Sequence, residues 1–153
     1  MSVFMLDTNA LNYIGKNTTF FEKIISSVKS GEISLYITHI QLGEINAIPA
    51  SEAELRSRLQ SFIQDYCKRV PTTGVICGIS ACGECGFSNG KDINAITKNS
   101  PKMIYDALIA ATANSGSDYL VTDDDDLRKR VVKELPRLAL LTNEEFQKIF
   151  LNK

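Results

Sequence analysis

Histidine is almost missing from this chain: His39 is the only one among 153 residues. A serine or threonine nucleophile usually needs a histidine base beside it, and the sequence offers no such arrangement. This scarcity argues against a hydrolase built on a catalytic triad. Because His39 stands at the start of an expected helix, we interpret it as a hydrogen-bonded structural residue without a catalytic role.

An excess of positive charge is also absent. Seventeen basic and eighteen acidic side chains leave a net charge of −1. Proteins that bind nucleic acids through bulk electrostatics carry a clear basic excess, so that class is not indicated. A nucleic-acid substrate is still compatible with the sequence, because bound metal ions could supply the missing positive charge.

Long apolar segments and nucleotide-binding loops are absent as well. No window approaches the roughly 20 apolar residues that a membrane span needs, and the opening MSVFMLDTNA lacks the basic and apolar regions of a signal peptide. A phosphate-binding loop of the GxxxxGKS or GxxxxGKT type is not present, which gives no support to a nucleotide-driven machine. We therefore expect a cytoplasmic protein with reduced thiols and no membrane association.

Short apolar runs alternate with amphipathic helical patterns along the chain. The runs typical of strands occupy residues 2–7, 32–38, 68–73, 118–122 and 137–142. The helical patterns occupy residues 20–28, 51–66, 102–116, 127–132 and 143–150. This alternation predicts an α/β fold, a three-layer α/β/α sandwich around a parallel sheet of about five strands. Since no repeat or linker interrupts it, we expect residues 1–153 to form one domain.

Start signals precede three of these helices. They are Ser51 with Glu54, Thr142 with Glu145, and Ser100 with Pro101. The first two pairs have the spacing of capping boxes, and the third places proline at the first helical position.

The segment 74–99 is rich in glycine and cysteine, and we expect a broken helix and a loop there. Cys82 and Cys85 have the spacing of half a zinc site, which Cys67 and Cys77 could complete. Structural zinc sites use two close pairs, however, and only one is present. Free cysteines are commonly buried, so we favour core thiols over Zn²⁺, and a redox pair is less favoured still.

Acidic residues follow two of the expected strands at the points where the strands end. Asp7 comes directly after the first strand, and four aspartates at 123–126 come directly after the fourth. Open parallel sheets bind ligands at the carboxyl ends of their strands. If these two strands are neighbours, their acids converge at one edge of the sheet.

Two further carboxylates lie in apolar surroundings on helical segments. Glu44 follows the second strand and is flanked by Ile40 and Ile45, and Asp106 has Ile109 one turn along the helix. A charge in such a setting is costly unless it is paired or bound to a cation. We therefore expect both side chains to point toward the same edge of the sheet.

Carboxylates gathered at one spot repel one another unless a cation neutralises them. Oxygen ligands without nearby thiolate or imidazole favour Mg²⁺ or Mn²⁺. Such a site can activate a water and stabilise the charge of an in-line attack on phosphorus. This chemistry needs neither a histidine nor a lysine base.

Four motifs, in this order, resemble those of the PIN domain, a metal-dependent ribonuclease fold. They are MLDTNALNYI, ITHIQLGEI, YDALIAATA and LVTDDDDL, and the resemblance spans nearly the whole chain. It implies that one or two Mg²⁺ or Mn²⁺ ions are held by Asp7, Glu44, Asp106 and Asp124.

The aspartate run fits the family pattern in one register. That pattern is threonine, any residue, aspartate, any residue, aspartate, hydrophobic; laid on residues 122–127, it selects Asp124 and Asp126. Asp123 and Asp125 then occupy variable, solvated positions. We rank Asp124 above Asp126 as a direct ligand, since Asp126 acts through water or only caps the following helix. The resemblance also implies supporting roles for Thr8, Asn9 and Thr122.

Within the family, the chain looks most like the small VapC-type toxins. This resemblance implies an endoribonuclease with an RNA substrate, an antitoxin protein as partner and a homodimeric assembly. Two alternatives stay open: a PIN-like module that binds RNA or protein without cleaving, and an RNA-processing nuclease that has no antitoxin.

Overall fold

The computed structural model describes residues 1–74, 83–86, 90–98 and 100–151. Much of the segment expected as a broken helix and a loop therefore lies outside the described residues, together with Cys77 and Cys82.

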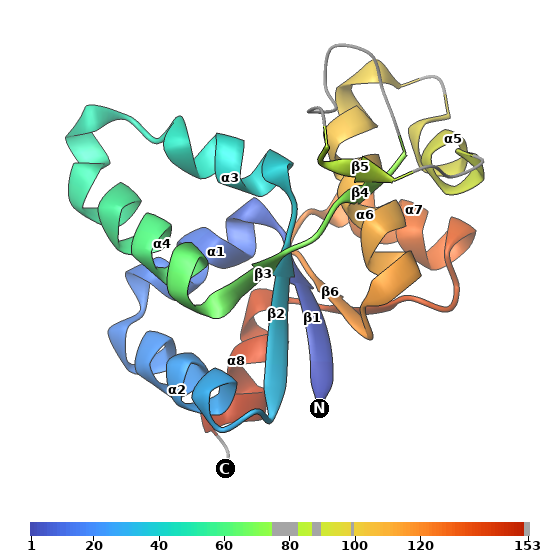
Figure 1. Ribbon diagram of the computed structural model, residues 1–153. Helices are drawn as coiled ribbons and strands as arrows, with labels where there is room; N and C mark the ends of the chain where they lie inside the picture. Colours follow the sequence, from blue (N-terminus) through green and yellow to red (C-terminus); the bar gives the residue numbers. More distant parts are fainter. Residues whose placement is uncertain (75–82, 87–89, 99, 152–153) are drawn as a thin grey trace.

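A five-stranded parallel sheet forms the centre of the fold, as the sequence predicted (Figure 1). Its strands are β1 (Ser2–Leu6), β2 (Ile33–Ile37), β3 (Cys67–Arg69), β6 (Tyr119–Val121) and β7 (Ala139–Leu141). They lie in the order β3-β2-β1-β6-β7, so the chain starts in the middle of the sheet and builds outward on both sides. The first and fourth expected strands, β1 and β6, are neighbours.

Helices cover both faces of the sheet and complete the expected three-layer sandwich (Figure 1). One side carries α1 (Thr8–Lys16), α2 (Thr18–Lys29), α3 (His39–Asn46), α4 (Ala53–Tyr66) and α8 (Asn143–Leu151). The other carries α5 (Lys91–Thr97), α6 (Ile104–Gly116) and α7 (Asp125–Glu134). Strand β1 supplies both cores: Phe4 and Leu6 face one, and Met5 faces the other. Among the described residues, no helix has the length and apolarity to cross a bilayer.

Of the three expected helix starts, one is confirmed and two are wrong. Thr142 and Glu145 form the capping box of α8: the Glu145 carboxylate accepts from Thr142 N at 2.7 Å, and Thr142 Oγ1 accepts from Glu145 N at 3.1 Å. Ser51 instead lies in a short 3₁₀ turn, Ala50–Glu52, and α4 begins after it without a side-chain cap. Pro101 likewise opens a 3₁₀ turn, Pro101–Met103, before α6 begins. Tight 3₁₀ turns are common at helix ends, and they shift the cap away from the residue that local sequence suggests.

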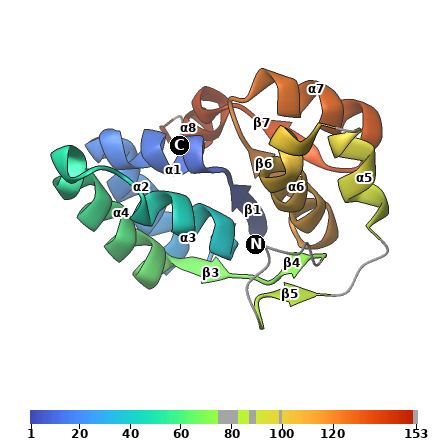
Figure 2. The same ribbon diagram turned by 90° about the horizontal axis from the view of Figure 1, so that it is seen from above.

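A second, two-stranded parallel sheet was not predicted. It pairs β4 (Thr72–Thr73) with β5 (Cys85–Gly86) and lies beside α6, where Thr73 N donates to Thr112 Oγ1 at 3.1 Å (Figure 2). In the run 68–73 the sequence predicted a brief strand ending near Pro71, and β3 does end at Arg69, shortly before this proline, which has no amide hydrogen to donate. Two-residue strands leave no periodic pattern in a sequence, which is why this sheet was missed.

Four phenylalanines tie β1, α2 and α8 together in one core. The Phe146 ring lies 4.9 Å from that of Phe4, 5.7 Å from that of Phe20 and 5.1 Å from that of Phe150. The contacts with Phe20 and Phe150 are edge-on, a favourable geometry for aromatic pairs. Phe146 therefore fastens the C-terminal helix to the strand that carries Asp7.

We expect Phe146→Ala to lower the free energy of unfolding by about 3 to 5 kcal/mol, because a large buried ring is replaced by a cavity. Urea unfolding followed by circular dichroism measures the loss. Ile149→Ala is the matched control: it lies on the same helix with 36% of its surface exposed, and it should cost less than about 1 kcal/mol. Equal losses in the two variants would contradict the assignment of Phe146 to the core.

Candidate functional site

The carboxyl ends of β1 and β6 meet at one edge of the sheet. Leu6 pairs with Val121 in the last register of the two strands, and Asp7 N donates to Val121 O at 3.1 Å. Asp7 and Thr122, which follow these strands, therefore lie side by side. This is the convergence of strand ends that the sequence predicted.

The carboxylate of Asp7 is held by donors on both of its oxygens. Oδ1 accepts from Thr8 N at 2.7 Å, and Oδ2 accepts from Asn9 Nδ2 and Thr122 Oγ1, each at 2.7 Å. Only 6% of the residue is exposed. Burial raises the pKa of Asp7, Glu44 and Asp124 raise it further by repulsion, and the hydrogen bonds from Thr122 and Thr8 act in the opposite direction. Asp7 also serves as the N-cap of α1.

The loop after β6 positions Asp124. Its backbone N donates to Thr122 Oγ1 at 3.1 Å, and its Oδ1 accepts from Leu127 N at 2.8 Å, which makes Asp124 the N-cap of α7. Asp124 thus caps the helix, a role that the sequence suggested for Asp126.

Asp123 has a defined structural contact that sequence reasoning missed. It was expected to be a variable, solvated position, yet its carboxylate accepts from Asn143 N at 2.8 Å and from Asn143 Nδ2 at 2.6 Å. Asp123 N in turn donates to Asn9 Oδ1 at 3.1 Å. These bonds tie the loop to the starts of α1 and α8. The partners lie 20 and 114 positions apart from it, so no local signal could have revealed them.

Glu44 is presented by a helix that is firmly attached to the end of β1. Thr38 and Gln41 form a capping box at the start of α3, and Gln41 Nε2 donates to Leu6 O at 2.9 Å. Glu44 is exposed, and its carboxylate turns toward the site, where it accepts a hydrogen bond from Thr8 Oγ1. Glu44 lies at the rim of the site. Its hydrogen-bond partner, Thr8, is the residue that follows the buried Asp7.

Asp106 interacts electrostatically with the other three acids. It lies half-buried in the first turn of α6, directly before the buried Ala107. Burial raises its pKa to about 6, with further contributions from Asp7, Asp124 and Glu44, in that order. A carboxyl group is repelled in this way only by charges close to it. The four acids selected from the sequence therefore face a common region.

Asp126 lies apart from this group. Its side chain is 84% exposed, and one oxygen lies 4.0 Å from Lys129 Nζ on the same helix. Asp125 and Asp126 occupy the first turn of α7, where negative charge favours the positive end of the helix dipole. This position favours an interaction of Asp126 with the helix dipole over direct ligation, although the N-cap itself is Asp124.

The donor set suits a hard divalent cation. Asp7, Glu44, Asp106 and Asp124 offer carboxylate oxygens only, and a cation would relieve the repulsion that raises the pKa of Asp7 and Asp106. Within the described residues, no three acidic, histidine or cysteine side chains are closed around a common point. Glu44 and Asp124 are turned instead to Thr8 and to the backbone of Leu127, as expected for carboxylates that repel one another.

The cysteine positions are only partly described. Cys67 belongs to β3, where burial raises the pKa of its thiol to about 12, and Cys85 belongs to β5. Such a thiol is a poor nucleophile and behaves as a core residue. Cys67 is partly buried and packs against the core, which fits the expectation of core thiols in part, while Cys77 and Cys82, on which the zinc alternative depends, lie outside the described residues.

The raised pKa of Asp106 predicts a pH-dependent cost in the metal-free protein. Below about pH 4 its carboxyl is protonated in both folded and unfolded states; above about pH 6 it is charged in both, and the folded state bears the cost of burying the charge and of the repulsion. With chelator present, Asp106→Asn should therefore be more stable than the wild type at about pH 7.5, and the difference should vanish as the pH falls from about 6 to about 4. Urea unfolding across this range measures it. Asp125→Asn, on an exposed residue, is the control, and a pH-independent effect of Asp106→Asn would contradict the repulsion.

Comparison with known proteins identifies the fold. No protein-family profile matches the sequence, and no curated protein matches it either. Among solved structures, this chain is similar to a chain of the VapBC2 complex from Rickettsia felis, with a TM-score of 0.57. That complex was solved bound to a DNA fragment from the VapBC2 promoter. The similarity covers 92% of this chain and 98% of that chain at 16% sequence identity. The protein therefore has the PIN-like fold of VapC toxins, which the four sequence motifs predicted.

Proposed function

We propose that the protein is a Mg²⁺- or Mn²⁺-dependent endoribonuclease whose metal is held by Asp7, Glu44, Asp106 and Asp124. The feature that supports this proposal is the proximity of Asp106 to three acids from other parts of the chain: burial is the largest cause of its raised pKa, and Asp7, Asp124 and Glu44 raise it further. Four converging carboxylates destabilise a folded protein unless a cation is bound among them. The PIN-like fold agrees with this assignment.

Three of the four acids have a distinct structural support. Asp7 is the fixed point, because three donors hold its oxygens. Thr8 orients Glu44, and the amide of Leu127 orients Asp124. A bound divalent ion would supply an activated water and stabilise charge on the leaving 3′ oxygen. Thr8, Asn9 and Thr122 are positioning residues in this proposal, since they contact the acids.

Purified protein should cut a mixed pool of tRNA and rRNA into discrete fragments with Mg²⁺ or Mn²⁺, and not with chelator. Asp7→Asn and Asp106→Asn should each reduce cleavage by at least about a hundred-fold, because each removes a metal-binding charge. Asp125→Asn is the matched control in the same aspartate run and should cut like the wild type. Asp126→Asn tests the remaining family position, and we expect it to keep most of its activity because its side chain faces solvent.

The outcomes separate the alternatives. Cutting that survives both Asp7→Asn and Asp106→Asn means a contaminating nuclease or a wrong site. Metal binding by the wild type without any cutting favours the PIN-like module that binds RNA or protein. Circular dichroism of each variant distinguishes a lost metal site from a lost fold.

We also propose that this nuclease is a cytoplasmic, homodimeric toxin held by an antitoxin protein. The similarity to a chain of the VapBC2 complex supports this proposal at the level of fold. The alternative, an RNA-processing nuclease without an antitoxin, shares the same site, so the chemistry alone does not distinguish them.

Expression in a bacterial host should arrest growth, and Asp7→Asn should abolish the arrest because it removes the catalytic charge. Co-expression of a small open reading frame adjacent to the gene should restore growth and yield a complex on size-exclusion chromatography. Light scattering on the purified protein gives its oligomeric state. A protein that cuts RNA without arresting growth, and that elutes without a partner, would support the RNA-processing alternative.

A further inference from the structure

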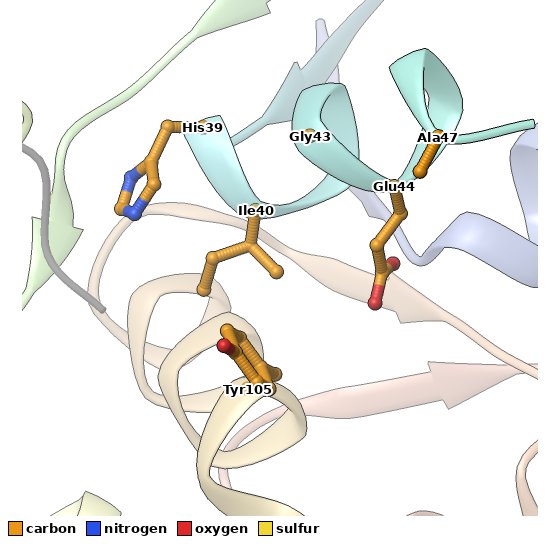
Figure 3. Close-up of a pocket in the computed structure, with 6 residues that line it drawn as sticks. All are labelled: His39, Ile40, Gly43, Glu44, Ala47 and Tyr105. Atoms are coloured by element: carbon orange, nitrogen blue, oxygen red, sulfur yellow. The ribbon is translucent and has the colours of Figure 1, made fainter. Parts of the chain in front are cut away.

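A groove of about 430 Å³ lies beside the acids, between α3 and the start of α6 (Figure 3). Its lining is His39, Ile40, Gly43, Glu44, Ala47 and Tyr105. The volume lies within the range of clefts that bind small organic ligands. Glu44 is the only charged acid in this lining, and the other walls are mainly apolar or aromatic.

Tyr105 is an exposed aromatic side chain at this groove. It is 47% exposed and stands one position before Asp106. Figure 3 shows its ring on α6, across from Ile40, with the carboxylate of Glu44 reaching from α3 into the same space. A large aromatic surface left in water costs free energy, and a flat ligand would recover it.

At Gly43, the α3 side of the groove has no side chain. A side chain built at this position would meet no atom within 4 Å, so packing does not require glycine here. Glycine in the second turn of a helix costs about 1 kcal/mol relative to alanine. Its presence leaves the groove open over the surface between Ile40 and Ala47.

The groove and the acids share one residue, Glu44, so the groove lies directly beside the acids. A phosphodiester placed at the acids would have its neighbouring base within reach of an aromatic, largely apolar surface. Sequence-tolerant binding of single-stranded nucleic acids combines these two elements, a backbone track and stacking aromatics.

We propose that the groove is a nucleobase subsite, in which Tyr105 stacks on an unpaired base next to the phosphate that is cut. The inference rests on the proposed ribonuclease function and adds a specific contact to it: the ring of Tyr105 against an unpaired base beside the scissile phosphate. Stacking surfaces accept any base, so the subsite favours exposed loops over a particular sequence.

A tryptophan reporter tests the subsite directly, because the chain contains no tryptophan of its own. Tyr105→Trp places one in the groove. Ca²⁺ replaces Mg²⁺ to keep the charge at the acids, and a gel confirms that the RNA stays intact. A short single-stranded RNA should quench the fluorescence of this variant, and an abasic strand of equal length and charge should not. Leu151→Trp is the control, since Leu151 is 43% exposed on a distant helix and should report no change with either strand.

Steady-state cleavage by variants that keep the acids gives the second readout. Tyr105→Leu keeps the bulk but removes the ring, so KM should rise by about ten-fold or more while kcat stays near the wild-type value. Tyr105→Phe keeps the ring and should match the wild type in both constants.

The results separate failure of the subsite from failure of the proposed function. Fluorescence anisotropy shows whether the RNA binds to Tyr105→Trp. If it binds, but the tryptophan emission is the same with the RNA and with the abasic strand, the subsite is wrong, whatever the cleavage assay gives. The same holds if the enzyme cuts RNA and Tyr105→Leu has an unchanged KM. Quenching by the RNA without any cleavage would support the subsite and contradict the proposed nuclease activity. RNA that binds neither tryptophan variant would overturn both.

Discussion

The parallel pairing of β1 with β6 places the carboxylate of Asp7 beside the hydroxyl of Thr122, and the rest of the site depends on this contact. Thr122 donates to Asp7 and accepts from both Asn9 and the backbone of Asp124. One hydroxyl thus fixes the buried acid and the loop that carries a second acid. Because the hydrogen bonds lie within the protein interior, each is costly to leave unmade.

The site concentrates negative charge that the surrounding fold must tolerate. Burial and repulsion raise the pKa of Asp7 and Asp106, which means that ionisation of these groups costs the metal-free protein stability. Hydrogen bonds from Thr122 and Thr8 offset part of that cost at Asp7. In the proposed metal site, a divalent cation would relieve the remaining cost when it binds. The repulsion among the carboxylates therefore affects both the proposed metal binding and the stability of the fold.

The sequence predicted the edge of the sheet at which Asp7 and the aspartate run lie, but not the hydrogen bonds that hold them, for a physical reason. Asp7 and the aspartate run could be placed because a parallel sheet brings strand ends to one edge. The bond from Gln41 to Leu6 O, and those from Asn143 to Asp123, join segments far apart in the chain. Such contacts depend on how α3 and α8 pack, and packing leaves no periodic signature. The capping box of α8 was found because its two partners are three residues apart, whereas the 3₁₀ turns before α4 and α6 displaced the caps expected there.

The sequence by itself determined the parallel α/β class and the five strands of the main sheet, and it selected the four candidate acids. These follow from local patterns: the alternation of apolar residues, and the position of each acid after a strand or on a helix. Only the tertiary structure decided that Asp124 caps α7 while Asp126 faces solvent, that Glu44 lies at an exposed rim, and that Asp123 holds the loop to α8. It alone formed the groove between Glu44 and Tyr105. The physical reason is that burial and hydrogen-bond partners belong to the packed arrangement of several elements, and no single segment of the chain contains them.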